Sequence, residues 1–324
     1  MRGNQNFLMM THPAPQTPYH RLARTAAHRW WRAPLGTAFI LAAGVVLVMF
    51  VYAAFTTAAL LAGRPDGPDG MPALGELGEL ALSFLTIAAL LPVVLAAARW
   101  VQRRPAGSLS SVTGRLRWGW LLTCLPVAVV AIVLVLGVSM LLPGPAGESS
   151  AFAGWGPFAA ATAVLLLVVP VQAAAEEYLM RGWVLQAFGT MLRGPWIPIA
   201  GQAVIFAALH GWGTPWGFAD LVVFGVVAGW LTVRTGGLEA AIALHVVNNL
   251  LGSVILAGYG DLAQTETAAD LPWQLVALDV PVLVAYAMVV SWLARRRGLA
   301  TVSPEPPARP AFPVDAPPVR ALSL

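Results

Sequence analysis

Two adjacent glutamates and an arginine stand inside a long apolar stretch, as Glu176, Glu177 and Arg181 of "AAEEYLMRG". A charged side chain at the centre of a bilayer costs about 2.5–3.5 kcal/mol on insertion scales, so such residues usually face a cavity or a partner. On a helix, Glu177 and Arg181 are four residues apart with the acid first, which is the favoured order for an ion pair. Glu176 lies about 100° around the helix from Glu177. It is therefore left as a carboxylate in need of another partner.

Two later apolar segments carry further polar side chains. His210 ends "FAALH", and His245 and Asn249 share one helical face in "HVVNN". Taken alone, a histidine in a membrane span is often only hydrogen-bonded between helices. Together with Glu176, however, these residues supply what hydrolysis by water requires, namely a base for the water and donors for the oxyanion. The sequence therefore predicts that Glu176, His210, His245 and Asn249 converge.

The composition is that of a membrane protein. Of 324 residues, 58% are hydrophobic and 10% are charged, with a mean hydropathy of +0.73. A soluble domain would carry about a quarter charged residues. The net charge of +4 is read as arginine on cytoplasmic loops, so no nucleic-acid partner is expected. The single cysteine, Cys124, excludes an intrachain disulfide, and no signal peptide is evident.

Apolar runs predict an all-α, polytopic membrane bundle of about eight transmembrane helices. The expected spans are roughly 36–62, 77–98, 118–142, 153–188 with a kink at Pro170, 195–211, 216–234, 238–257 and 273–294. We expect a basic cytoplasmic tail over 1–35, a membrane domain over 36–298 and a Pro-rich, disordered tail over 299–324.

Charge asymmetry predicts the orientation of the bundle. With eight spans, nearly all loop arginines fall on one side and the acidic loops on the other, with Arg64 as the visible exception. This pattern predicts a multi-pass protein of the cell membrane with both termini in the cytoplasm. The amphipathic stretch "SLSSVTGRLRW" is expected to lie on the inner membrane face. Asp220 and Asp279 fall near the ends of spans and are expected to be interfacial.

The three motifs in this order resemble the signature of the CPBP family, which includes the CAAX prenyl endoproteases and bacteriocin-processing, Abi-like relatives. The motifs "EEYLMR", "FAALH" and "HVVNN" match it at every position, and the resemblance covers roughly 155–255. It implies an intramembrane endopeptidase in which Glu176 is the general base and His210 works with it on the attacking water. His245 and Asn249 would hold the oxyanion, and Glu177 would pair with Arg181.

Several alternatives stay open at this point. Glu176, His210 and His245 also form a possible zinc set of two histidines and one carboxylate, although "HExxH" is absent and the family resemblance favours hydrolysis without a cofactor. Counting along the fifth span places His210 about 10 Å deeper than Glu176 and His245, unless that helix is tilted or shifted.

The activity has rivals as well. The bundle could be a catalytically silent scaffold or bacteriocin-immunity protein, or a small-solute transporter, although no internal repeat supports the last. The expected partners are membrane lipid and a peptide or membrane-anchored protein substrate. A bacterial peptide precursor is a candidate beside a CAAX-like protein.

Overall fold

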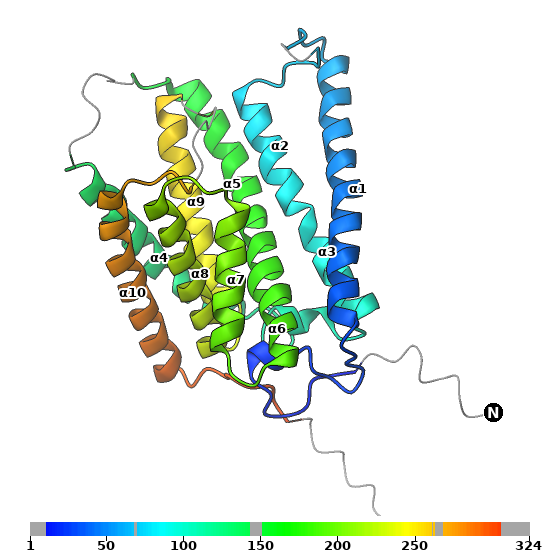
Figure 1. Cartoon of the computed structure of the whole chain (residues 1–324). Helices are drawn as coiled ribbons and strands as arrows, with labels where there is room; N and C mark the ends of the chain where they lie inside the picture. The colour runs from blue at the N-terminus through cyan, green and yellow to red at the C-terminus, as the bar shows by residue number, and fades with distance from the viewer. Residues whose placement is uncertain (1–10, 68–69, 143–150, 261, 263–267, 306–324) are drawn as a thin grey trace, which may run out of the picture.

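The chain folds into a bundle of membrane-length helices (Figure 1), here a computed structural model that describes residues 11–67, 70–142, 151–260, 262 and 268–305. The helices are α1 Arg32–Leu61, α2 Glu76–Ala88, α3 Leu90–Ala96, α4 Trp118–Ser139, α5 Trp155–Glu177, α6 Leu185–Met191, α7 Trp196–Leu209, α8 Pro215–Thr235, α9 Glu239–Tyr259 and α10 Trp273–Arg296. Two π-helical segments, Ala97–Val101 and Tyr178–Val184, continue α3 and join α5 to α6. The predicted all-α fold is confirmed.

Seven stretches of helix are long and apolar enough to cross a membrane within the described part of the chain. Two of them are composite, because α2 and α3 continue to Val101 and α5 runs through its π-segment to Met191. The fifth predicted span is α7, which has 14 residues. At 1.5 Å per residue it is about 21 Å long, shorter than the roughly 30 Å hydrocarbon layer. The eight predicted spans therefore all form apolar helices, but α7 is too short to cross alone.

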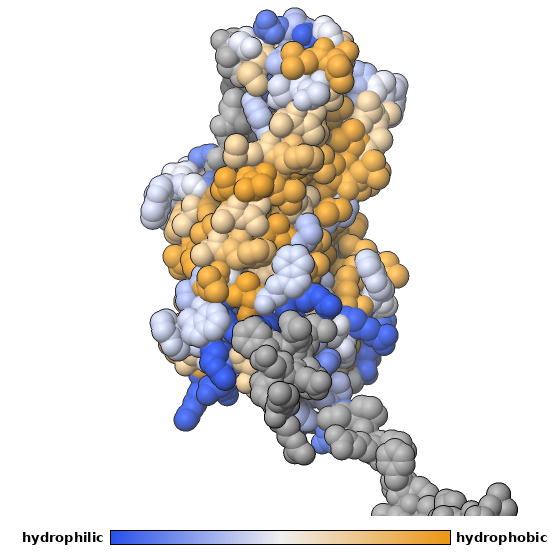
Figure 2. Space-filling model, turned by 90° about the vertical axis from the view of Figure 1, so that its right-hand side faces the viewer, coloured by the Kyte–Doolittle hydropathy of each residue, from blue (hydrophilic) through white to orange (hydrophobic). Residues whose placement is uncertain are grey.

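The outer surface of the bundle matches a lipid environment. Figure 2 shows a broad hydrophobic band with hydrophilic residues gathered below it. Exposed tryptophans occur near both ends of the helices, as they do at membrane interfaces. At the end where α1 begins and α10 ends they include Trp30, Trp31, Trp100, Trp118 and Trp196, and at the other end they include Trp155, Trp212, Trp216 and Trp273. We call the former end the basic end.

Helix α9 lies at the centre of the site-bearing half of the bundle. It packs against α4, α5 and α8, and all five residues from Ala240 to Leu244 are buried. A helix that is apolar on every side is expected in such a position. The next residue is His245, so one motif histidine follows directly from the most buried stretch of the core.

Three segments close the basic end of the bundle: residues 11–31, 102–117 and 297–305. The Tyr19 hydroxyl donates a hydrogen bond to the carbonyl of Leu109, and the amide of Ser303 donates to the carbonyl of Thr17 at 2.9 Å. Residues 299–303 are thus packed, so the start of the predicted disordered tail is wrong. The rest of that prediction, 306–324, and residues 1–10 of the N-terminal tail lie outside the described residues.

Contrary to the prediction, the first half of "SLSSVTGRLRW", residues 108–112, is buried against protein, whereas Trp118 at its end is exposed. Leu109 and Ser111 are fully buried, and Ser111 forms a β-bridge with Gly237 in the turn between α8 and α9. The amide of Val112 donates to the carbonyl of Gly236 at 2.8 Å. The amphipathic pattern therefore reflects packing against that turn.

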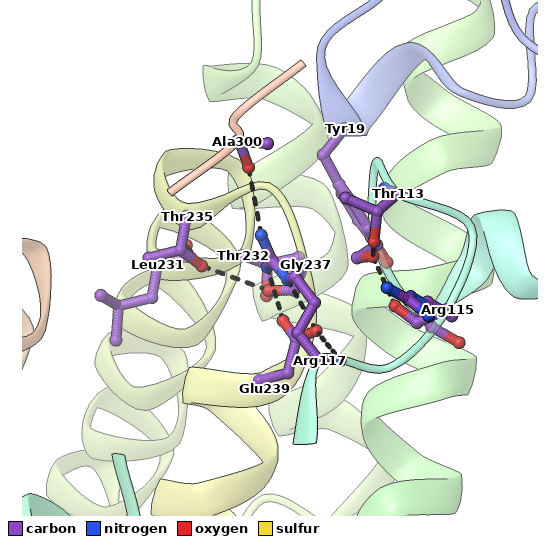
Figure 3. A network of polar contacts seen from close by, with 12 residues as sticks. Tyr19, Thr113, Arg115, Arg117, Leu231, Thr232, Thr235, Gly237, Glu239 and Ala300 are labelled. Atoms are coloured by element: carbon purple, nitrogen blue, oxygen red, sulfur yellow. Dashed lines mark hydrogen bonds and ion pairs between the residues drawn. The ribbon is translucent and has the colours of Figure 1, made fainter. Parts of the chain in front are cut away.

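A buried ion pair fastens this loop to the first turn of α9 (Figure 3). Both carboxylate oxygens of Glu239 accept hydrogen bonds from the Arg117 guanidinium, at 2.9 and 2.6 Å, and one also accepts from the Arg117 amide at 2.8 Å. Glu239 is fully buried, and the Arg117 side chain is 12% exposed. Because a carboxylate also suits a helix N-terminus, this pair fixes the start of the helix that carries His245 and Asn249.

Replacing Glu239 with alanine should destabilise the fold. Removing one partner of a buried ion pair costs about 3–5 kcal/mol, because the other charge stays buried without compensation. The free energy of unfolding in detergent micelles measures the effect. Glu79→Ala is the matched control, since Glu79 is exposed on α2 and its loss should change that energy by less than about 0.5 kcal/mol. Equal values for both variants would contradict the role given to this pair.

Candidate active site

The fully buried carboxylate of Glu177 joins two of the three motif segments. Its Oε1 accepts a hydrogen bond from Arg181 Nη1 at 2.9 Å and another from His245 Nδ1 at 2.7 Å. Arg181 is also fully buried, and the exposed fraction of His245 is 3%. The ion pair within the α5 region thus also sets the orientation of a histidine on α9, a contact that helical spacing did not predict.

Phe206 and Phe224 complete the surroundings of Arg181. The guanidinium carbon lies 4.4 Å from the centroid of the Phe206 ring and 5.6 Å from that of Phe224. Arg181 Nε and Nη2 have no hydrogen-bond partner among the described residues, so the aromatic faces supply part of their stabilisation. The Phe206 ring also lies 4.5 Å from the His210 ring. The aromatic residue of "FAALH" therefore has a defined place between Arg181 and His210.

Glu176 faces the two motif histidines. Its Oε2 lies 4.0 Å from His210 Nε2 and 3.9 Å from His245 Nε2. The Glu176 side chain is 15% exposed, whereas that of its neighbour Glu177 is fully buried. The structure thus brings Glu176, His210 and His245 together from α5, α7 and α9.

The hydrogen-bond partners fix which nitrogen of each ring carries a proton. His210 Nδ1 lies 2.9 Å from the carbonyl oxygen of Phe206, and His245 Nδ1 lies against the carboxylate of Glu177. Both of these oxygens only accept hydrogen bonds, so both Nδ1 atoms carry hydrogen. In a neutral ring the remaining nitrogen, Nε2, then carries a lone pair that points toward Glu176.

Gln172 links the remaining members of the site. Its Nε2 donates to Glu176 Oε1 at 2.5 Å, and its Oε1 accepts from Asn249 Nδ2 at 3.2 Å. No role for Gln172 is predicted from the sequence. Its position one helical turn before Glu176 was the available signal, because residues four apart share a helix face.

The predicted depth offset of His210 is absent. From Glu176 to Met191 the chain descends 15 residues, or about 22 Å, and from Trp196 to His210 it climbs 14 residues, or about 21 Å. The long continuation of α5 through its π-segment and α6 places the next turn far enough below the site to bring His210 level with Glu176. A π-helical segment directly after the glutamates is also a frequent feature of functional sites.

The donor set is only partly suited to zinc. Two histidines whose Nδ1 atoms are held by a carbonyl and a carboxylate are typical of zinc sites. Ligands at 2.0–2.1 Å in tetrahedral geometry, however, lie about 3.3 Å apart, whereas the separations here are 3.9 and 4.0 Å. In the described part of the chain, no three His, Cys, Asp or Glu side chains are close enough to hold an ion. The spacing fits a bridging water better, since a water oxygen lies about 2.8 Å from each partner.

A cavity of about 280 Å³ opens beside the histidines, between α4, α7, α8, α9 and α10. His210, His245 and Asn249 line it, and so do Asp220 and Asp279. Asp220 is buried, with an exposed fraction of 6%, so the prediction that it is interfacial is wrong. Its position five residues into α8 is already inside the bundle, because the α7–α8 turn lies below the tops of α5 and α9 (Figure 1).

The fold and the site define a polytopic membrane protein with a buried centre of acid–base side chains. The sequence model described as type II CAAX prenyl endopeptidase Rce1-like matches residues 158–251, which include every motif residue. The uncharacterized protein YyaK of Bacillus subtilis (strain 168) is 27% identical over 146 residues, which cover 41% of this chain and 48% of YyaK. The match thus spans about half the length of that relative. No solved structure matches this chain.

These comparisons confirm the resemblance to the CPBP family for the segment 158–251, which matches the Rce1-like model.

The two adjacent glutamates should respond differently to truncation. Glu177→Ala leaves the buried Arg181 without its partner and should lower the free energy of unfolding by about 3–5 kcal/mol. Glu176→Ala removes one hydrogen bond at a partly exposed site and should cost about 1 kcal/mol. Unfolding in detergent micelles, followed by intrinsic fluorescence, compares the two. A larger loss for Glu176→Ala would contradict the structural role assigned to Glu177.

Proposed function

We propose that this protein is an intramembrane endopeptidase in which Glu176 activates a water molecule. One observation carries the proposal: Glu176 Oε2 faces two imidazole Nε2 atoms across gaps of 3.9 and 4.0 Å, the width that one water oxygen spans. The Rce1-like match over these same residues supports a protease of the CAAX type. The fully buried Arg181–Glu177 pair behind the site keeps this geometry fixed.

In the first step the water donates one hydrogen bond to Glu176 Oε2 and the other to His210 Nε2. Its oxygen attacks the carbonyl carbon of the scissile peptide bond while its proton passes to Glu176. The developing oxyanion accepts hydrogen bonds from Asn249 Nδ2 and from His245 Nε2. Donation from that nitrogen requires a doubly protonated ring, whose other N–H, at Nδ1, is held by Glu177 at 2.7 Å. Such preorganised donors are usually the largest contribution to acyl-transfer catalysis.

In the second step Glu176 returns the proton to the leaving nitrogen. The C–N bond breaks, and the products are a carboxylic acid and an amine, so one water is consumed in each cycle. A carboxylate in a low-dielectric site is suited to taking and then giving a proton. Gln172 holds the other oxygen of Glu176 at 2.5 Å and so directs Oε2 at the water.

The substrate on this proposal is a peptide or membrane-anchored protein that enters from the lipid. The arginine-rich basic end would face the cytoplasm of a cell membrane, as expected from the charge of the loops. Zinc has no step in this mechanism, although Glu176, His210 and His245 are the residues that would hold it.

Cleavage of a membrane-anchored peptide library by purified protein tests the proposal. The wild type should cleave, Glu176→Gln should lower the rate by at least about 10³-fold because the general base is lost, and a zinc chelator should have no effect. Loss of cleavage on chelation would assign the chemistry to a metal instead. Full activity in Glu176→Gln would contradict the mechanism, and an inactive wild type across CAAX-like and precursor peptides would favour a silent scaffold.

Asn249→Ala should separate catalysis from binding. A donor that acts on the oxyanion stabilises the transition state more than the substrate, so kcat should fall by about 10²–10³-fold with little change in KM. Steady-state kinetics on the best library peptide measure both constants. A rise in KM at unchanged kcat would show instead that Asn249 only binds substrate.

A further inference from the structure

Two carboxylates share the cavity with the catalytic histidines but take no part in the proposed mechanism. They are Asp220 on α8 and Asp279 on α10, and both line the cavity of about 280 Å³. Asp220 is only 6% exposed, and its Oδ1 has no hydrogen-bond partner among the described residues. A buried polar atom that lines a cavity without a partner indicates a missing ligand, because its desolvation is otherwise uncompensated.

No cation of the described chain compensates either carboxylate. No arginine or histidine of the described residues lies within ion-pair distance of Asp220 or Asp279. The sequence has no lysine, and the arginines of α8 and α10 are Arg234, Arg295 and Arg296 at the basic end. Two carboxylates in one partly enclosed space raise the cost of burial further. A positive charge that enters the cavity therefore finds two ready partners.

The other walls of the cavity suit an organic cation. They are largely aliphatic, with Ile132, Val135 and Leu136 on one side and Leu221 and Leu275 on the other. An arginine or lysine buries its hydrocarbon stem against such walls while its head group reaches a carboxylate. A guanidinium also forms bidentate hydrogen bonds with carboxylates. Ca²⁺ and Mg²⁺ instead require about six oxygen ligands, which two aspartates do not supply.

We propose that Asp220 and Asp279 form a cation-binding subsite that selects peptides with an arginine or lysine near the scissile bond. The inference rests on the proposed function, since it names the substrate class of that same site. The subsite and His210 line one cavity, so a basic side chain seated there lies beside the reacting carbonyl.

Binding measured without cleavage tests the subsite. Glu176→Gln protein in lipid nanodiscs is titrated with fluorescent membrane-anchored peptides that carry arginine or its neutral isostere citrulline at successive positions. At one or two positions the arginine peptide should bind about tenfold or more tightly, as expected for hydrogen bonds between charged groups. Adding Asp220→Asn or Asp279→Asn should remove that preference. Asp66→Asn, which removes an exposed acid in the loop between α1 and α2, should retain it.

Equal binding of arginine and citrulline peptides at every position would overturn the inference, and so would a preference that survives the double aspartate variant. Calcium or magnesium binding that displaces the peptide would assign the pair to a metal ion. If Asp220→Asn melts early, the partly exposed Asp279→Asn carries the test. A preference for arginine without any cleavage by the wild type would leave the subsite standing while the protease function fails.

Discussion

The site depends first on the carboxylate of Glu177, which holds Arg181 and His245 at once. Neither the glutamate nor the arginine reaches solvent, so each is tolerable in the bundle only because the other is present. The same oxygen orients a histidine on α9, and the guanidinium lies over the ring of Phe206 on α7. One desolvated charge pair therefore connects α5, α7 and α9. The neighbouring residue, Glu176, is directed into the space between these helices.

The second constraint is the position of the helix turns. The turn between α6 and α7 lies about 22 Å below Glu176, whereas the turn between α8 and α9 lies only six residues, or about 9 Å, below His245. The α8–α9 turn therefore does not extend to the basic end of the bundle. The segment 102–117 packs beneath this turn and is attached to it by the ion pair between Arg117 and Glu239. Polar interactions at the basic end thereby hold α9 at the depth that its histidine requires.

The fold could be predicted almost entirely from sequence, because apolar length and charge asymmetry act locally along each span. The pairing of Glu177 with Arg181 also follows from spacing on one helix. What spacing could not supply was contact between helices: the bond from His245 to Glu177, the role of Gln172 and the burial of Asp220. Helix continues three residues past the predicted end at Phe188, to Met191, which removes about 4.5 Å of the offset of about 10 Å expected for His210. The rest of the offset relative to His245 is removed because the α8–α9 turn lies higher in the bundle than the α6–α7 turn. The burial of residues 108–112 could not be predicted for a related reason, since an amphipathic pattern does not distinguish a lipid surface from a protein one.

The two oxygens of Glu176 have different surroundings, and this difference gives the site its direction. Oε1 is held by Gln172, which is itself held by Asn249, whereas Oε2 faces the two Nε2 atoms. A carboxylate free to rotate would present either oxygen to the water and lose part of the advantage of a fixed base. Because Asn249 reaches Gln172 with one amide hydrogen, its second hydrogen is left for an oxyanion. The hydrogen bonds from Glu176 through Gln172 to Asn249 thus orient the proposed base and the proposed oxyanion donor together. Asn249 lies one helical turn after His245, so both side chains are on the face of α9 that meets this chain of hydrogen bonds.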